Sequence, residues 1–167
     1  MTSDEGEHPF TECATFADNI KGQGYSWQSD WHFIDQAYYD LGGDASDYPD
    51  FHPSTETVVD ALTNLTGFLS GDQSVNDSSY VKQIQSSFSD VSDQRSFALR
   101  LVIHYIGDIH QPLHTVSEVD KYVPEGDRGG NLEHMPDPTD SGVTNLHSVW
   151  DSVIYEYPGY PNLVSFS

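Results

Sequence analysis

The chain has 167 residues, of which 36% are hydrophobic and 13% aromatic, so it can form one domain with a core and is not expected to be disordered. Its 27 acidic and 6 basic residues give a formal net charge of −21. This charge disfavours a protein that grips nucleic-acid phosphates through Lys and Arg, or one that docks on an anionic membrane. We therefore expect a single domain over residues 1–167, with no membrane association and no implied protein partner.

The N-terminal residues indicate little about location. Residues 1–10 are acidic and lack the positive and apolar regions of a signal peptide. Cys13 is the only cysteine, which excludes an intrachain disulfide. The triplets that begin at Asn64 and Asn76 match the glycosylation acceptor pattern and favour a secreted glycoprotein weakly.

The first half of the chain contains three predicted helices. Short helices are expected near residues 13–21 and 31–39. Apolar residues at helical spacing predict a longer helix over 55–69, which Gly71 would end. An acidic loop separates the second and third of these helices.

The second half contains the most apolar predicted helix, over residues 93–109, capped by Asp90 or Ser92. It is apolar nearly all round, so we expect it to be central and buried. A last helix is expected over 145–155. Together these elements predict an all-α protein whose long loops, rich in Gly, Asp, Pro and Ser, are residues 42–54, 70–79 and 117–142.

Histidine and aspartate recur at helical spacing. His104 and Asp108 are four residues apart, so both side chains leave the same face of a buried helix, where unpaired polar groups are costly. His147 and Asp151 repeat this spacing, and His114 follows shortly after the first pair. A single such pair can be an ordinary hydrogen-bonded couple in a core. Two pairs and a further histidine predict a site for more than one metal ion.

Upstream residues add two further candidates, since His32 lies among aromatic residues and Asp18 follows an apolar pair. Nitrogen ligands mixed with carboxylates, without a cysteine cluster, favour zinc over other divalent metals.

Five segments, in this order, resemble the S1/P1 nuclease family of zinc-dependent single-strand nucleases, which is related to bacterial zinc phospholipase C. The resemblance covers roughly residues 14–155, and its two longest motifs are highly specific together. It implies a phospholipase C/P1 nuclease-like helical domain, here expected in a version truncated at both its N- and C-terminal ends; the alternative is a genuinely shortened homologue that has lost the third zinc. The segments are Phe16-Ala-Asp18, Trp31-His-Phe-Ile-Asp35, His104-Tyr-Ile-Gly-Asp-Ile-His-Gln-Pro-Leu-His114, Asp127-Arg-Gly-Gly-Asn131 and Asn145-Leu-His-Ser-Val-Trp-Asp151.

The resemblance also implies a ligand set. Its first zinc would be held by Asp18, His32, His104 and Asp108, and its second by His114, His147 and Asp151. Asp108 would also bind a third zinc, but the N-terminal tryptophan and histidine that complete this site in the family have no match here, and His8 is not expected to replace them. The sequence thus supports two zinc sites and leaves the third incomplete.

The remaining roles follow from the same resemblance. Asp18 would orient the water nucleophile and is the candidate catalytic residue. Phe33 and Asp35 match a substrate-binding base pocket, in which a ring stacks on a base and a carboxylate accepts hydrogen bonds from the base edge. His110 and Asn131 would support the ligands from behind, without direct chemistry.

We therefore expect a secreted or lumenal zinc endonuclease that hydrolyses single-stranded DNA and RNA to 5′-phosphate products and also acts as a 3′-nucleotidase. The alternatives are a metal-binding pseudoenzyme or inactive fragment of the family and, less favoured, a zinc phospholipase C. The charge of −21 then acts as a constraint, because the positive charge that meets nucleic acid must come from zinc.

Overall fold

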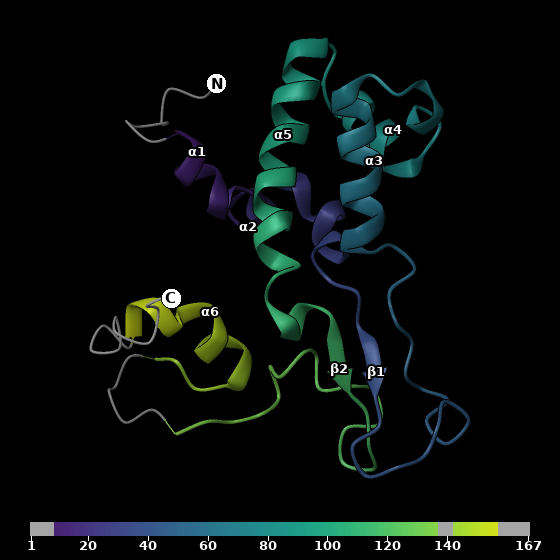
Figure 1. The fold of residues 1–167 in the computed structure, drawn as a ribbon, viewed down its shortest axis with the longest axis vertical. Coiled ribbons are helices and arrows are strands. Elements are labelled where there is room, and N and C mark those ends of the chain that lie inside the picture. The colour runs from purple at the N-terminus through teal and green to yellow at the C-terminus, as the bar shows by residue number, and fades with distance from the viewer. Residues whose placement is uncertain (1–8, 137–141, 157–167) are drawn as a thin grey trace, which may run out of the picture. The chain divides into compact units, whose positions relative to one another are not determined.

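The protein is seen here as a computed structural model, which describes residues 9–136 and 142–156 (Figure 1). The chain divides into two compact units. The first contains the residues up to Ile34 and Ser54–His114, and the second contains Asp35–Pro53 and the residues from Thr115 onward. The described residues are mostly helical, which confirms the predicted all-α class. None of their helices is both long and apolar enough to cross a membrane.

The first unit begins with a broken series of short helical segments instead of the single helix expected near residues 13–21. A wide helical turn over Lys21–Tyr25 interrupts the series, and in it Gly24 adopts a φ of 95°, which glycine tolerates best. The series runs through α1 (Pro9–Glu12), a 3₁₀ turn (Cys13–Thr15), α2 (Phe16–Ile20), the wide turn and a 3₁₀ helix (Ser26–His32).

The prediction of a helix over 31–39 is wrong. The chain leaves the helical region at Phe33, whose φ and ψ are −128° and 166°. Residues Gln36–Tyr38 then form the strand β1. The aromatic residues in this stretch favour a strand as readily as a helix, and pairing with a distant strand decides the outcome.

Helix α3 (Val58–Ser70) confirms the third predicted helix. Thr57 caps its start by accepting a hydrogen bond from the backbone N–H of Asp60 at 3.2 Å. Gly71 ends it with a φ of 87°, the left-handed conformation that glycine adopts without a steric penalty.

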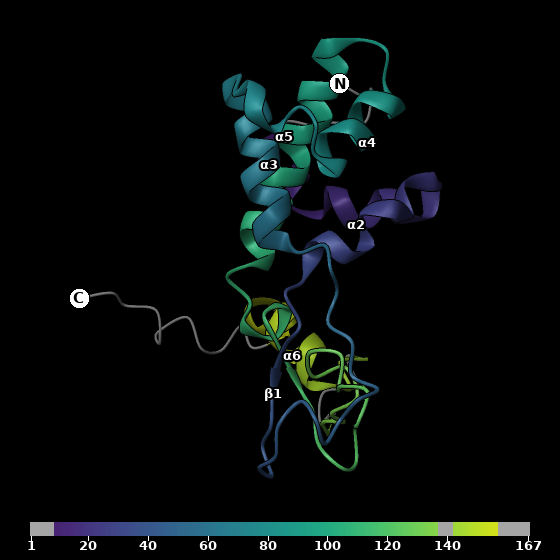
Figure 2. The same cartoon turned by 90° about the vertical axis from the view of Figure 1, so that its right-hand side faces the viewer.

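Helix α4 (Ser79–Ser87) was not predicted, because its serine-rich sequence lies in a stretch read partly as a loop. Helix α5 (Val91–Asp108) was predicted, and Asp90 caps it by accepting from two backbone N–H groups. It packs against α2, α3 and α4, so its central position is confirmed (Figures 1 and 2). Complete burial was wrong, since Leu99 and Ile106, seven residues apart on one face, are 49% and 48% exposed.

The core of the first unit lies between α5, α3 and the short helices. Leu65, Leu101 and Trp31 are almost fully buried there. Burying one such side chain stabilises the fold by about 1.5–3 kcal/mol. Trp27 extends this core, since the centre of its ring lies 5.0 Å from that of Trp31 and 6.1 Å from that of Phe97. This packing holds the N-terminal segments against α5.

The second unit contains a small parallel sheet, in which Gln36 of β1 pairs with Val116 of β2 (Val116–Glu118) (Figure 1). Its helix α6 (Leu146–Glu156) confirms the last predicted helix. Between β2 and α6, Asp127 opens a tight turn whose next three residues all have a positive φ, with values of 59°, 62° and 79° for Arg128, Gly129 and Gly130.

Candidate metal centre

Two residues of α5 form the buried base of the centre. The helical spacing of His104 and Asp108 places His104 Nε2 3.2 Å from Asp108 Oδ2. The two side chains are only 5% and 12% exposed. The last turn of α5 therefore presents a nitrogen and a carboxylate oxygen side by side, as the spacing predicted.

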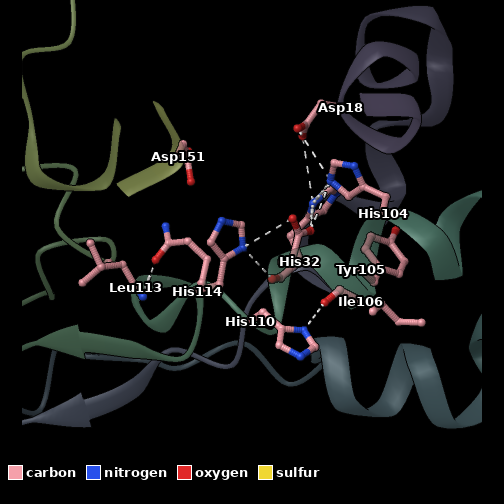
Figure 3. Close-up of polar contacts among 12 residues, drawn as sticks. Asp18, His32, His104, Tyr105, Ile106, His110, Leu113, His114 and Asp151 are labelled. Carbon is pink, nitrogen blue, oxygen red and sulfur yellow. Dashed lines mark hydrogen bonds and ion pairs between the residues drawn. The ribbon is translucent and has the colours of Figure 1, made fainter. Parts of the chain in front are cut away.

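The N-terminal segments bring two more donors to this pair (Figure 3). His32, at the end of the Ser26–His32 helix, places Nδ1 2.8 Å from Asp108 Oδ2 and 3.2 Å from His104 Nε2. Asp18 of α2 lies 3.6 Å from His104 Nε2 and 4.0 Å from His32 Nδ1 through its two carboxylate oxygens. Asp18 is 59% exposed, so it forms the open side of a cluster whose other members are buried.

Each of the two imidazole rings has a hydrogen-bond acceptor beside its outer nitrogen, on the side away from this cluster. His104 Nδ1 donates to the backbone carbonyl of Ala14, and His32 Nε2 lies 2.7 Å from the side-chain oxygen of Gln28. Both neighbours are acceptors, so each neutral ring carries its proton on the outer nitrogen. The inner nitrogens then point lone pairs at the oxygens of Asp108 and Asp18.

Four lone-pair donors at such short distances need a cation between them. A second proton is one candidate: burial lowers the pKa of His32 and disfavours the proton there, whereas at His104 burial is outweighed by the hydrogen bond and charge of Asp108, which raise the pKa. A metal ion also fits the geometry. With metal–nitrogen bonds of 2.0–2.1 Å, tetrahedral ligands lie about 3.4 Å apart, which falls inside the range of 2.8 to 4.0 Å found here.

The charges of the cluster also suit a cation. Burial would raise the pKa of Asp108, but the adjacent His104 and His32 outweigh it and hold the pKa well below its usual value. Burial acts in the same sense on Asp18, and there the hydrogen bond and charge of Lys21 outweigh it and lower the pKa. Both carboxyl groups are therefore ionised at neutral pH.

The candidates for a second metal ion lie in both units. In the first unit His114 is buried, its Nδ1 lies 3.0 Å from the carbonyl oxygen of His32, and its ring stacks on Phe33 at 4.7 Å. In the second unit His147 and Asp151 lie on α6, with Nε2 and Oδ2 3.4 Å apart. That all three bind one ion stays a prediction.

The carbonyl pattern of the first cluster recurs at His147. Its Nδ1 lies 2.8 Å from the carbonyl oxygen of Gly129, so Nε2 is left as the nitrogen that faces Asp151. This carbonyl belongs to the tight turn opened by Asp127. The buried Asp127 carboxylate shapes the turn, because it accepts hydrogen bonds from the Gly130 and Glu118 N–H groups and the Ser117 hydroxyl at 2.7, 2.8 and 3.1 Å.

Comparison with known proteins agrees with this donor chemistry. Residues 1–162 match the family described as S1/P1 Nuclease. The chain belongs to the S1/P1 nuclease family.

The S1/P1 nuclease relatives are considerably longer than this chain. It is 30% identical over 163 residues to Endonuclease 2 of Arabidopsis thaliana, a match that covers 93% of the chain and 47% of the relative. It is 29% identical over 157 residues to Nuclease S1 of Aspergillus oryzae (strain ATCC 42149 / RIB 40), covering 91% and 44%. Endonuclease 3 of Arabidopsis thaliana is 32% identical over 132 residues, covering 79% and 37%. The chain thus spans less than half the length of these relatives.

Four residues of the S1/P1 motifs were expected to bind substrate or to support the metal ligands, and the structure places each of them. Phe33 is half-buried and held by its stack on His114. Asp35, half-buried in the second unit, has a φ of 53°. His110 is exposed, lies just beyond α5 and donates to the Ile106 carbonyl of that helix, and Asn131 is exposed and donates to the Arg128 carbonyl (Figure 3 shows His110). These interactions do not test the roles implied by the resemblance, which stay predictions. His8 lies outside the described residues.

Three residues around the centre were missed by sequence reasoning. Lys21 places its ammonium 2.8 Å from Asp18 Oδ1, three residues along the chain. Gln28 lies four residues before His32, a helical spacing that could have indicated the contact. Asp127 was recognised as part of a motif, but nothing in its spacing indicated that it shapes the turn beside His147.

Proposed function

We propose that this chain is the metal-binding part of an endonuclease that hydrolyses phosphodiester bonds in single-stranded DNA and RNA. One observation carries the proposal: ligand atoms of Asp18, His32 and His104 lie within 4.8 Å of one another, with Asp108 against both histidines, in a chain of a family described as nucleases. We further propose 5′-phosphate products and 3′-nucleotidase activity, which the family resemblance implies.

We assign zinc to this point, held by Asp18, His32, His104 and Asp108, because two imidazoles and two carboxylates form a ligand set typical of zinc. A second zinc would be held by His114, His147 and Asp151. In both of these histidines a carbonyl lies near Nδ1, which favours Nε2 as the ligand atom. A third zinc would again use Asp108.

Bound zinc would lower the pKa of a water molecule and neutralise charge that develops on the phosphoryl oxygens. Asp18 is suited to orient that water, since its ionised carboxylate is the exposed member of the cluster. Water would attack phosphorus in line, its oxygen forming the new bond as the bond between phosphorus and the 3′ oxygen breaks, and the 3′ oxygen would leave with a proton from the water. The phosphate would therefore stay on the 5′ oxygen of the fragment 3′ to the cut.

Lys21 places a positively charged ammonium group beside the Asp18 carboxylate. Its ammonium lies 2.8 Å from Asp18 and the side chain is 31% exposed, so it can reach an anionic oxygen next to Asp18. The chain has only 6 Lys and Arg in all, and a polyanionic substrate meets an overall charge of −21. Metal charge and Lys21 together would supply the local attraction that the rest of the surface lacks.

Phe33 and Asp35 would bind the base. A ring can stack on any base, and it favours unpaired strands because their base faces are exposed. The stack on His114 holds the Phe33 ring in place, so one face of the ring is already covered and a base would use the other. Asp35 would accept hydrogen bonds from the base edge.

The decisive experiment measures zinc per chain and the hydrolysis of single-stranded DNA before and after chelation. His104→Ala should lose the zinc of the first site and all hydrolysis, because it removes a buried ligand. His52→Ala is the matched control, since His52 is an exposed loop histidine outside the cluster. Release of phosphate from 3′-AMP, but not from 5′-AMP, tests the 3′-nucleotidase activity.

Each result separates the hypotheses. A parent protein without zinc would disprove the metal site. Zinc without hydrolysis would favour a metal-binding pseudoenzyme or inactive fragment, and hydrolysis of phosphatidylcholine in place of DNA would favour a phospholipase C.

We also propose a secreted or lumenal location, on the basis of the family. The glycosylation triplets at Asn64 and Asn76 offer a test. Expression in a eukaryotic secretory pathway should yield a protein whose mass falls on treatment with a glycosidase, and an unchanged mass would count against glycosylation.

A further inference from the structure

Behind His32 lies a buried polar residue that no metal-ligand motif requires. The Gln28 side chain has no exposed surface, and Tyr105 and His32 beside it are 0% and 1% exposed. Polar groups buried this deeply are costly unless they are hydrogen-bonded. The hydrogen-bond partners of Gln28 therefore show which of its side-chain atoms donates, which accepts, and which His32 nitrogen carries the proton.

The orientation of the Gln28 amide follows from its partners. The side-chain nitrogen donates to the backbone carbonyl oxygen of Ala17 at 2.8 Å, and a carbonyl oxygen can only accept. The amide oxygen must therefore face the other way, where Tyr105 donates its hydroxyl proton to it at 2.6 Å.

The same oxygen decides the tautomer of His32. Gln28 Oε1 lies 2.7 Å from His32 Nε2, and because the oxygen only accepts, Nε2 must carry the proton. In the neutral ring Nδ1 is then unprotonated, and Nδ1 is the nitrogen that faces Asp108 and His104. The opposite tautomer would place two acceptors against each other at 2.7 Å.

We propose that Gln28 is a positioning residue for the metal centre: its amide, oriented by Ala17 and Tyr105, holds His32 in the tautomer and rotation that aim Nδ1 at the ion. This proposal rests on the proposed function only for the identity of the ion. Supporting groups of this kind change metal affinity by about 10–100-fold when they are removed. Gln28 and Tyr105 thus act through His32 and do not touch the metal or the substrate.

The test compares four variants of the whole chain. Gln28→Leu removes the acceptor, Gln28→Glu keeps an acceptor for His32 but loses the donor to Ala17, Tyr105→Phe removes only the hydroxyl that orients the amide, and Gln94→Leu is the matched control. Gln94 is also a buried glutamine of the first unit, but it donates to the carbonyl of Phe88, away from the cluster. Zinc affinity is measured by competition with a chelator, and the His32 tautomer by long-range ¹H–¹⁵N correlation in metal-free protein.

We expect Gln28→Leu to weaken zinc binding about 10–100-fold and to lose the pure Nε2–H tautomer of His32. Tyr105→Phe should stay within a few-fold of the parent, and Gln28→Glu should keep the Nε2–H tautomer of His32, because it still offers that nitrogen an acceptor. Gln94→Leu should leave both measurements unchanged even if it lowers the melting temperature. An equal loss of affinity in Gln28→Leu and Gln94→Leu would overturn the proposal, because general destabilisation would then explain it. A parent spectrum with the proton on Nδ1 would also overturn it.

These outcomes are independent of those for the proposed function. A parent that binds zinc but does not cleave DNA would disprove the nuclease activity and leave the role of Gln28 standing. If the parent binds no zinc, the tautomer in metal-free Gln28→Leu still decides whether Gln28 orients His32.

Discussion

Asp127 provides the sharpest test of how the second unit positions His147. Both of its carboxylate oxygens are in use: Oδ1 accepts from Ser117 and Glu118, and Oδ2 accepts from the buried backbone N–H of Gly130. In Asp127→Asn one oxygen becomes an NH₂ group, so at least one N–H donor must face another donor.

The size of the effect follows from that mismatch. A hydrogen bond to a charged group contributes about 1.5–3 kcal/mol, and a buried donor left without a partner costs about 1–3 kcal/mol. Because these two contributions overlap, we expect Asp127→Asn to lower the free energy of unfolding by about 2–4 kcal/mol. The turn through Gly129 should loosen as well, which would release the His147 ring from the carbonyl that accepts its Nδ1 proton.

Asp120→Asn is the matched control. Asp120 is also a buried aspartate of the second unit, but both of its backbone hydrogen bonds, from the N–H groups of Tyr122 and Val123, end on the single oxygen Oδ1. Asparagine can keep that oxygen, so this substitution should cost less than about 1 kcal/mol. Urea unfolding measures the stabilities, and long-range ¹H–¹⁵N correlation measures the His147 tautomer. If the two variants are equally destabilised, or if His147 is unchanged in Asp127→Asn, the reasoning about this turn is refuted.

Two further predictions concern charged residues. Burial and then the charge of Glu133 raise the pKa of Glu118, so the ionised form of Glu118 opposes folding. This penalty is absent at pH 3 and grows as the pH rises through the pKa of Glu118 in the unfolded and then in the folded protein. Glu118→Gln should therefore raise the melting temperature at pH 7 but not at pH 3. Salt at 1 M should reduce this gain, because it screens the repulsion from Glu133. An equal gain at both pH values would contradict this explanation. Lys21→Met should lower hydrolysis of single-stranded DNA about tenfold or more without weakening zinc binding, because it removes a cation and leaves Asp18 as a ligand. If zinc binding and activity fall in parallel, Lys21 only maintains the structure of the site.

The parts of the fold that sequence predicted well are those with strong local signals. Helices α3 and α5 have long apolar periodicity and clear caps at Thr57, Asp90 and Gly71. These signals are local, because the spacing of apolar residues and the conformational freedom of glycine act within a few residues. Helix α4 and the strand β1 lack such signals. Strand β1 forms only because residues 36–38 pair with residues 116–118, a contact between positions far apart in the sequence.

For the site, sequence alone determined which residue types are present and which of them share a helix face. The pair His104 and Asp108 follows from a spacing of four residues, as does the pair His147 and Asp151. These calculations need only the 3.6-residue period of the helix.

Tertiary structure decided which atoms of those residues face one another. That His32 Nδ1 meets Asp108, and that Gln28 holds the opposite nitrogen, depends on the packing of the short N-terminal helices against α5. Helical periodicity specifies on which face of a helix a side chain lies. The tautomer and rotation of a histidine ring are set by the donors and acceptors that tertiary packing places on either side of the ring. For this protein, the sequence determined the chemistry that a metal ion would meet, and only the folded structure determined the direction from which each lone pair points.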